Sequence, residues 1–275
     1  MRTTTTWDDL LYPGKAENFF SPPFPPFDPS ARSYLPGNAL WLAELSRLVY
    51  RNPPLPLPPI NSFPPSATYI RHNYVVSLAT DTQAMLIEFG GGSPFAVLVF
   101  RGTEQKLQDI ITDLKIGKHT LGKDKVGVHE GFSEALDSVW CKIEKELDAL
   151  KCPVFFTGHS LGAALATLAA ARRLPQYPPK AVYTFGSPRV GNSDFVASLG
   201  SIGTIIHRVV DDEDIVTTLP PEKLGFEHAG TLHKLTAPAC SGTIFSWLDG
   251  LFRPPKLLAD HAPINYVDRI RATLL

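Results

Sequence analysis

Ser160 stands in a short stretch whose residue types and spacing could produce a reactive hydroxyl. The residues GHSLG at positions 158–162 follow a short apolar run at 154–156 and precede a segment rich in alanine and leucine. A glycine two residues before and two residues after the serine allows a strand and a helix to approach each other at a sharp turn. Such a turn puts the serine in sparsely allowed backbone space and exposes its oxygen. The pattern therefore predicts a nucleophile for acyl transfer.

A serine hydroxyl is a weak nucleophile, so it needs a neighbouring imidazole that a carboxylate orients. Where this motif opens a helix, the expected order along the chain is serine, acid, histidine. The residues after the apolar run 205–210 are all acidic: Asp211, Asp212, Glu213 and Asp214. Sites in sheets of this kind lie at strand ends, so one of these carboxylates is expected to be the acid. The others are then members of a solvated acidic loop.

Several of the eight histidines could act as the base. His228 and His233 lie in a strand-like segment after the acidic cluster, and His261 lies near the C-terminus. His159 directly precedes the serine, and its side chain is expected to point away from the serine hydroxyl. No two histidines share a close spacing with a carboxylate of the kind found in zinc motifs, so no metal site is predicted.

Acyl transfer also needs hydrogen-bond donors for the charge that develops on the substrate carbonyl. One donor is expected to be the N–H of Leu161, the residue after the nucleophile. The other should come from a loop after an earlier strand, and Arg101-Gly102-Thr103 follows the apolar run 95–100. The same three residues also fit an ordinary strand exit with a turn glycine.

A short amphipathic helix is predicted directly after Thr103. Four apolar residues recur there at intervals of three and four: Leu107, Ile110, Ile111 and Leu114. This spacing places them on one face of a helix. The face could cover a site and move away from it, or it could be packed permanently against the core.

The elements that must position these residues alternate along the chain. Apolar periodicity predicts strands at 84–89, 95–101, 154–156, 181–185 and 205–210, and helices at 38–51, 132–150 and 160–171. Strands that alternate with helices indicate an α/β fold with a mostly parallel sheet and helices on both faces. Residues 1–35 are rich in proline and phenylalanine, which predicts an irregular N-terminal arm before a single domain at 36–275.

The overall composition excludes several classes of partner. The 275 residues carry 26 Lys and Arg against 27 Asp and Glu, with no basic stripe, so no nucleic-acid partner is predicted. No run reaches the roughly 18 apolar residues of a transmembrane helix. The N-terminus lacks the apolar run of a secretory signal, which is compatible with a cytoplasmic chain, a processed one, or export without a cleaved signal.

Several motifs in order resemble the class 3, fungal-type lipase family of the α/β-hydrolase fold. The residues that carry the resemblance are ALWLAELSRLVYR (39–51), VLVFRGTE (97–104), VHEGFSEAL (128–136), FTGHSLGAALA (156–166), YTFGSPRVGN (183–192), DIVTTLPP (214–221) and DHAPINY (260–266). The resemblance spans some 230 positions and leaves out the proline-rich arm.

The resemblance implies roles for individual residues. The acid of the family stands directly before Ile-Val, which selects Asp214 over Asp211 or Asp212. Its catalytic histidine stands shortly before a tyrosine, which selects His261 over His228. It further implies that Thr103 offers its N–H to the oxyanion and that the helix after it is a lid.

The expected function is therefore hydrolysis of carboxylic esters by a serine hydrolase, with triacylglycerols as the foremost substrates. The lid implies work at a lipid–water interface, and the mechanism needs no cofactor or metal. Phospholipase A1 and short-chain carboxylesterase are the alternatives within the enzyme class. Outside it, some proteins of this fold are non-catalytic scaffolds, usually marked by a lost serine or histidine.

Overall fold

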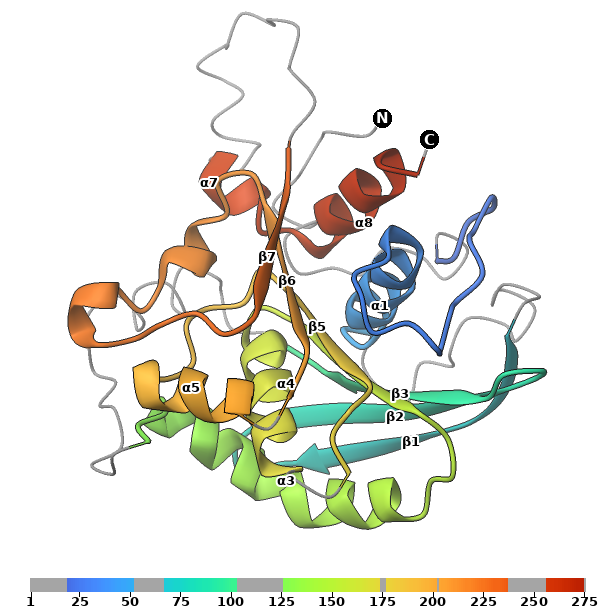
Figure 1. The fold of residues 1–275 in the computed structure, drawn as a ribbon, viewed down its shortest axis with the longest axis horizontal. Coiled ribbons are helices and arrows are strands. Elements are labelled where there is room, and N and C mark those ends of the chain that lie inside the picture. Colours follow the sequence, from blue (N-terminus) through green and yellow to red (C-terminus); the bar gives the residue numbers. More distant parts are fainter. Residues whose placement is uncertain are drawn as a thin grey trace, which may run out of the picture.

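A sheet of seven strands forms the centre of the molecule (Figure 1). The computed structural model describes residues 19–51, 67–102, 126–173, 177–201, 203–236 and 256–274. The strands are β1 (Thr68–Ser77), β2 (Thr82–Gly90), β3 (Phe95–Phe100), β4 (Val154–His159), β5 (Ala181–Phe185), β6 (Ile206–Asp211) and β7 (Thr231–Leu235). They lie side by side in sequence order, antiparallel from β1 to β3 and parallel from β3 to β7. The predicted α/β fold with a mostly parallel sheet is confirmed.

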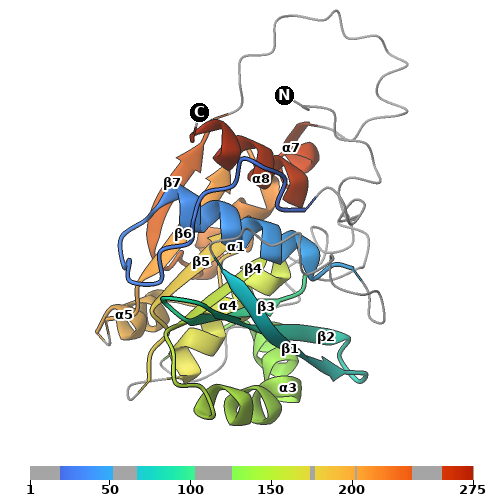
Figure 2. The same ribbon diagram turned by 90° about the vertical axis from the view of Figure 1, so that its right-hand side faces the viewer.

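The helices divide between the two faces of the sheet (Figures 1 and 2). One face carries α3 (Glu130–Asp148), α4 (Leu161–Arg172) and α5 (Ser193–Ser201). Each parallel connection advances by one strand in the same direction, so right-handed crossovers place these helices on the same side. The opposite face is therefore covered by segments from outside the crossovers, namely α1 (Pro36–Leu48) and α8 (Pro263–Ala272).

Shorter helical turns connect these elements. They are η4 (Ile215–Thr218), η5 (Glu222–Leu224) and α7 (Lys256–Ala259). In the described part of the chain, no helix combines the length and the apolar character that crossing a membrane requires.

The side chains of strand β3 pack into the core on both faces of the sheet. All six of its residues are buried. Because side chains alternate along a strand, Ala96, Leu98 and Phe100 pack with α3 and α4. Phe95, Val97 and Val99 pack on the other side with α1. The nearly continuous apolar run at 95–100 is thus a strand covered on both faces, as predicted.

The predicted elements agree with the structure to within a few residues, but some elements were missed. The helices predicted at 38–51 and 132–150 are α1 and α3, and the strand predicted at 205–210 is β6. No prediction was made for β1, α5 or α8. Strand β1 lies at the sheet edge with mostly exposed or half-buried residues, so it lacks a clear alternation of apolar and polar side chains.

The described part of the proline-rich arm packs onto the face that carries α1. The ring of Phe27 stacks on Phe95 with centroids 4.2 Å apart and meets the edge of Trp41. The ring of Phe19 lies 3.9 Å from the guanidinium carbon of Arg47. Through these contacts the arm adds buried aromatic side chains to the core on this face of the sheet.

Replacing Phe27 by alanine should therefore destabilise the whole fold. The buried ring is lost and a cavity remains, which costs about 3–5 kcal/mol of unfolding free energy. Urea unfolding followed by tryptophan fluorescence measures the change. Phe24→Ala, at a half-buried position of the same arm, serves as the control and should cost less. An unchanged midpoint for Phe27→Ala would contradict this role of Phe27.

Candidate active site

Ser160 occupies a strained turn between β4 and α4. Its backbone has φ 59° and ψ −128°, a region that side-chain-bearing residues rarely adopt. A methyl group on Gly158 would overlap the backbone of Gly162, and one on Gly162 would overlap the carbonyl of Phe100. Both glycines are therefore required where β3, β4 and α4 meet. The strained backbone of Ser160 and the close approach of strand and helix confirm the sharp turn that the GHSLG spacing predicted, and Ser160 itself is buried.

His261 and Asp214 form a buried pair. The Nδ1 atom of His261 lies 2.8 Å from Oδ2 and 3.0 Å from Oδ1 of Asp214. Each residue is 1% exposed. Because a carboxylate accepts, Nδ1 carries the hydrogen of a neutral imidazole and the Nε2 lone pair remains available for a proton. This is the arrangement that a general base oriented by a carboxylate requires.

Two further donors hold the Asp214 carboxylate. The hydroxyl of Tyr266 donates to Oδ2 at 2.6 Å, and the backbone N–H of Val216 donates to Oδ1 at 2.9 Å. The second bond is the N-cap of the short turn η4. Burial, with the nearby Asp214 charge adding to it, raises the pKa of Tyr266 well above its usual value, so the phenol keeps its hydrogen. The carboxylate orientation is therefore fixed from two elements.

Arg269 joins the segment of the acid to the segment of the histidine. Its guanidinium bonds to Asp211 at the end of β6 and, at 2.7 Å, to Oδ1 of Asp260, the residue before His261. Oδ2 of Asp260 also accepts the backbone N–H of Glu213 at 3.3 Å. The guanidinium of Arg269, from α8, thus joins the two loops.

Gly186 provides the space in which the pair lies. It follows β5 and has φ 60°. A methyl group there would come within 2.8 Å of Asp214 Oδ2 and 2.9 Å of His261 Nδ1. Only glycine combines this backbone conformation with the required clearance.

The other candidates from the sequence have different surroundings. Asp211 is buried against Arg269, and burial raises its pKa to about 8. His228 bonds to the carbonyl of Thr217 at 2.7 Å. His233 contacts the ring of His207 and stacks on Tyr34. Within the described residues neither histidine meets a carboxylate, so the structure brings together only His261 with Asp214.

The oxyanion candidates are described only in part. Leu161 is the first residue of α4, and its backbone N–H has no partner among the described residues. This amide lies in the first turn, where helix N–H groups are free to meet an anion. Thr103 and the predicted lid residues Leu107, Ile110, Ile111 and Leu114 lie outside the described residues.

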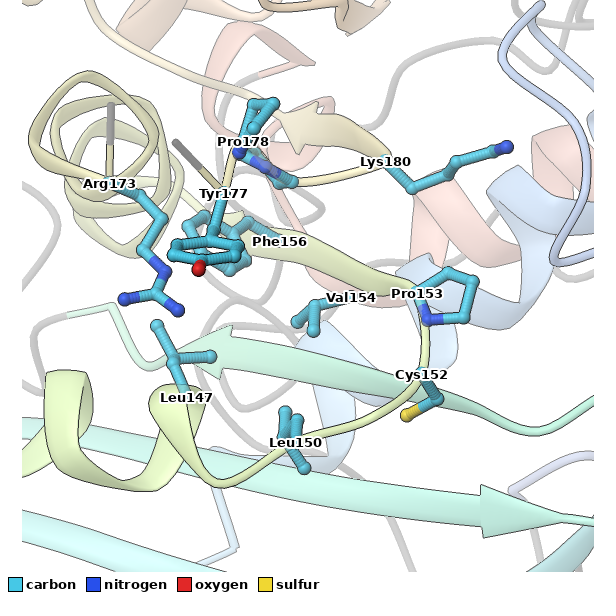
Figure 3. Close-up of a pocket in the computed structure, with 11 residues that line it drawn as sticks. Leu147, Leu150, Cys152, Pro153, Val154, Phe156, Arg173, Tyr177, Pro178 and Lys180 are labelled. Atoms are coloured by element: carbon cyan, nitrogen blue, oxygen red, sulfur yellow. The ribbon is translucent and has the colours of Figure 1, made fainter. Parts of the chain in front are cut away.

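A pocket of about 310 Å³ lies where the parallel strands β4 and β5 begin, at the end of the sheet opposite Ser160 (Figure 3). It is lined by the end of α3 and the start of β4, including Leu147, Cys152 and Val154. Arg173 lies beside the ring of Tyr177, whereas Lys180 points away. Ser160 follows the opposite end of β4, so this pocket is separate from the candidate site.

Comparison with known proteins identifies the family. A family model described as lipase (class 3) matches residues 97–224. Lipase II from Rhizopus niveus is 32% identical with a TM-score of 0.52, and the match covers 62% of this chain and 67% of that one. The chain belongs to the class 3 lipase family.

Other proteins named as lipases extend the comparison. The native propeptide complex of Rhizomucor miehei lipase is 28% identical with a TM-score of 0.55, covering 74% of this chain and 67% of that one. A secreted mono- and diacylglycerol lipase from Fusarium solani is 38% identical over 148 residues, or 51% of this chain and 40% of that protein. The sequence match to the Rhizopus niveus lipase covers 42% of the length of that protein. This chain therefore spans about two fifths of the length of these curated relatives.

Sequence reasoning missed three residues that shape the candidate site of this member of the class 3 lipase family: Tyr266, Arg269 and Gly186. Gly186 gave a usable signal, since a glycine directly after a buried strand at the reactive edge often marks a close approach. Tyr266 and Arg269 lie three residues apart, so they share one face of α8. This spacing becomes informative only when residues 263–272 are recognised as a helix, and no helix was predicted there.

Gly186→Ala should abolish most turnover while the fold remains. The added methyl group pushes His261 away from Asp214, and a displacement of about 1 Å can cost about 100-fold in rate. The measurement is kcat for an activated ester, with circular dichroism to verify folding. Gly200→Ala is the control, since a methyl group there meets nothing within 4 Å. Equal kcat in the two variants would contradict this role of Gly186.

His228 should make stability depend on pH. Burial first, then repulsion by Arg208, lowers its pKa from 6.5 to about 4. The unfolded chain therefore binds more protons than the folded one between these values, so unfolding free energy falls as pH drops from 6.5 to 4. In His228→Gln this loss should be smaller, while kcat at pH 8 stays unchanged. Thermal unfolding from pH 4 to 8 tests it, and identical slopes in wild type and variant would refute it.

Proposed function

We propose that this chain hydrolyses carboxylic esters of lipids, with triacylglycerols as its foremost substrates, through an acyl-enzyme on Ser160. The observation that carries the proposal is the buried hydrogen bond from His261 Nδ1 to Asp214, at the same edge of the sheet as a serine on a strained turn. Family membership supports the same reaction class.

In the first half of the reaction, Ser160 Oγ attacks the ester carbonyl carbon. His261 Nε2 takes the hydroxyl proton, and the Asp214 carboxylate holds the resulting imidazolium through Nδ1–H. The carbonyl oxygen becomes an oxyanion, to which Leu161 and Thr103 donate their N–H groups. When the tetrahedral intermediate collapses, the ester C–O bond breaks and the alcohol leaves with the proton from His261.

In the second half, water replaces the alcohol. His261 Nε2 takes a proton from the water as its oxygen attacks the acyl carbon, and a second tetrahedral intermediate forms. Its collapse releases the carboxylic acid and returns the proton to Ser160. These steps use side chains, backbone amides and water alone, so the proposal invokes no cofactor.

The substrate class rests on the relatives and on the segment after Thr103. Similar proteins carry the names lipase, from Rhizopus niveus, and mono- and diacylglycerol lipase, from Fusarium solani. The apolar face of Leu107, Ile110, Ile111 and Leu114 would suit a lid that exchanges contact with the site for contact with lipid. A lipid–water interface is therefore part of the proposed working environment.

Phospholipase A1 activity is the second candidate. A chloroplastic phospholipase A(1) of Arabidopsis thaliana is 46% identical over 70 residues, which cover 24% of this chain. This match is short, so triacylglycerols remain the first choice. A short-chain carboxylesterase would share the same catalytic residues, whereas a scaffold would have no need of the buried His261–Asp214 pair.

Ser160→Ala tests the proposal on p-nitrophenyl esters from C2 to C16, below and above substrate aggregation. Wild type should hydrolyse long-chain esters faster once they aggregate, and the variant should lose roughly 10⁶-fold in kcat because the nucleophile is gone. A phosphatidylcholine substrate in parallel tests the second candidate.

The outcomes separate the alternatives. Ser160-dependent cleavage of short chains alone would identify an esterase and contradict the lipid substrate. Ser160-dependent release of fatty acid from phosphatidylcholine, without triacylglycerol cleavage, would identify a phospholipase. If wild type cleaves no ester, or if Ser160→Ala is as active as wild type, the serine hydrolase proposal is wrong.

A further inference from the structure

A buried tyrosine and a buried histidine connect α1 to the backbone of His261. The hydroxyl of Tyr50, just beyond α1, lies 2.9 Å from Nδ1 of His159, the last residue of β4. The other ring nitrogen of His159, Nε2, lies 2.7 Å from the backbone carbonyl oxygen of His261. Tyr50 is 5% exposed and His159 2% exposed, so both bonds are shielded from water.

The partners determine where the hydrogens lie. A backbone carbonyl can only accept, so Nε2 of His159 carries a hydrogen and donates it to His261. In the neutral ring Nδ1 then holds a lone pair, so the Tyr50 hydroxyl donates to it. The chain of donors thus runs from Tyr50 through His159 to His261, with one tautomer of His159.

The surroundings keep His159 neutral. Burial, followed by the charge of His261, lowers the pKa of His159 well below 6.5. The two imidazole rings have centroids 4.5 Å apart. When His261 takes a proton during the reaction, a neutral His159 therefore adds no like charge beside it.

Tyr50 also contacts the exit of β3. Its phenolic oxygen packs against Gly102. A methyl group on Gly102 would overlap that oxygen, so the absence of a side chain permits the contact. A single hydroxyl therefore meets both the strand that precedes Thr103 and the residue that precedes Ser160.

We propose that Tyr50 and His159 are positioning residues that fix the main chain of His261. This inference rests on the proposed ester hydrolysis. Asp214 holds the ring of His261 at Nδ1, the His261 N–H donates to the carbonyl of Leu258 at 3.1 Å, and Arg269 holds Asp260. None of these bonds reaches the carbonyl of His261, and the bond from His159 fixes that group. Ring and carbonyl are then both held from outside the segment, which sets the orientation of the imidazole.

The test compares three variants of the full chain with two matched controls. Tyr50→Phe removes one oxygen, His159→Leu removes both ring nitrogens, and His159→Gln keeps an amide that can donate to the carbonyl. Tyr183→Phe and His207→Leu are the controls. They remove a buried phenol and a buried imidazole that also bond to backbone carbonyls, on strands β5 and β6.

Kinetics on a p-nitrophenyl ester supply the readout, and a fluorophosphonate counts the reactive sites. Tyr50→Phe and His159→Leu should lower kcat by about 10- to 100-fold with KM unchanged, because the base is misplaced while substrate binding is intact. His159→Gln should recover most of kcat. The controls should keep kcat even where thermal unfolding shows a comparable loss of stability.

Three results would overturn the inference, and a fourth result concerns the function itself. Unchanged kcat in Tyr50→Phe and His159→Leu, or an equal fall in the two controls, shows that the pair does not position the base. A kcat of His159→Gln no higher than that of His159→Leu would also show that the pair does not position the base. Wild type without Ser160-dependent turnover refutes the proposed function and, with it, this inference.

Discussion

The contact between three backbone segments at Gly158, Gly162 and Phe100 determines most of what surrounds Ser160. No side chain fits between β4, α4 and the end of β3, so the chain turns within a single residue. That residue takes a positive φ, and its strain is maintained by strands buried on both faces. The serine is therefore presented where buried strands meet, and these strands cannot shift without opening the core.

The rest of the site is a polar network placed inside an apolar structure. Buried polar groups are costly unless they are paired, and here Tyr266, Val216 and His261 share the carboxylate of Asp214. Helix α8 contributes both Tyr266 and Arg269 to this region. Its apolar residues cover the sheet face that the crossover helices leave open, so a single helix serves packing and chemistry.

Local sequence predicted the parts of the fold that depend on local pattern. The strand β3, the helix α3 and the serine turn each follow from spacing within fewer than twenty residues. The pairing of His261 with Asp214 is different, because these residues lie 47 positions apart and several other histidines and carboxylates competed. The resemblance to the class 3 lipase family selected His261 and Asp214 from these candidates. The contacts of Arg269 and Tyr50 arise only when distant segments meet, so local spacing did not identify them. Gly186 offered one local signal, a glycine directly after a buried strand.

The position of α8 also affects the time at which the site can be completed during synthesis. The serine turn and Asp214 leave the ribosome well before His261, and the base is held by α8, which packs against α1 from the other end of the described chain. Glu44 on α1 also lies 3.5 Å from Arg271 of α8. A growing chain thus carries Ser160 and Asp214 without a positioned His261 until α8 packs against α1. Completion of the candidate site is therefore coupled to the meeting of the first and last described helices.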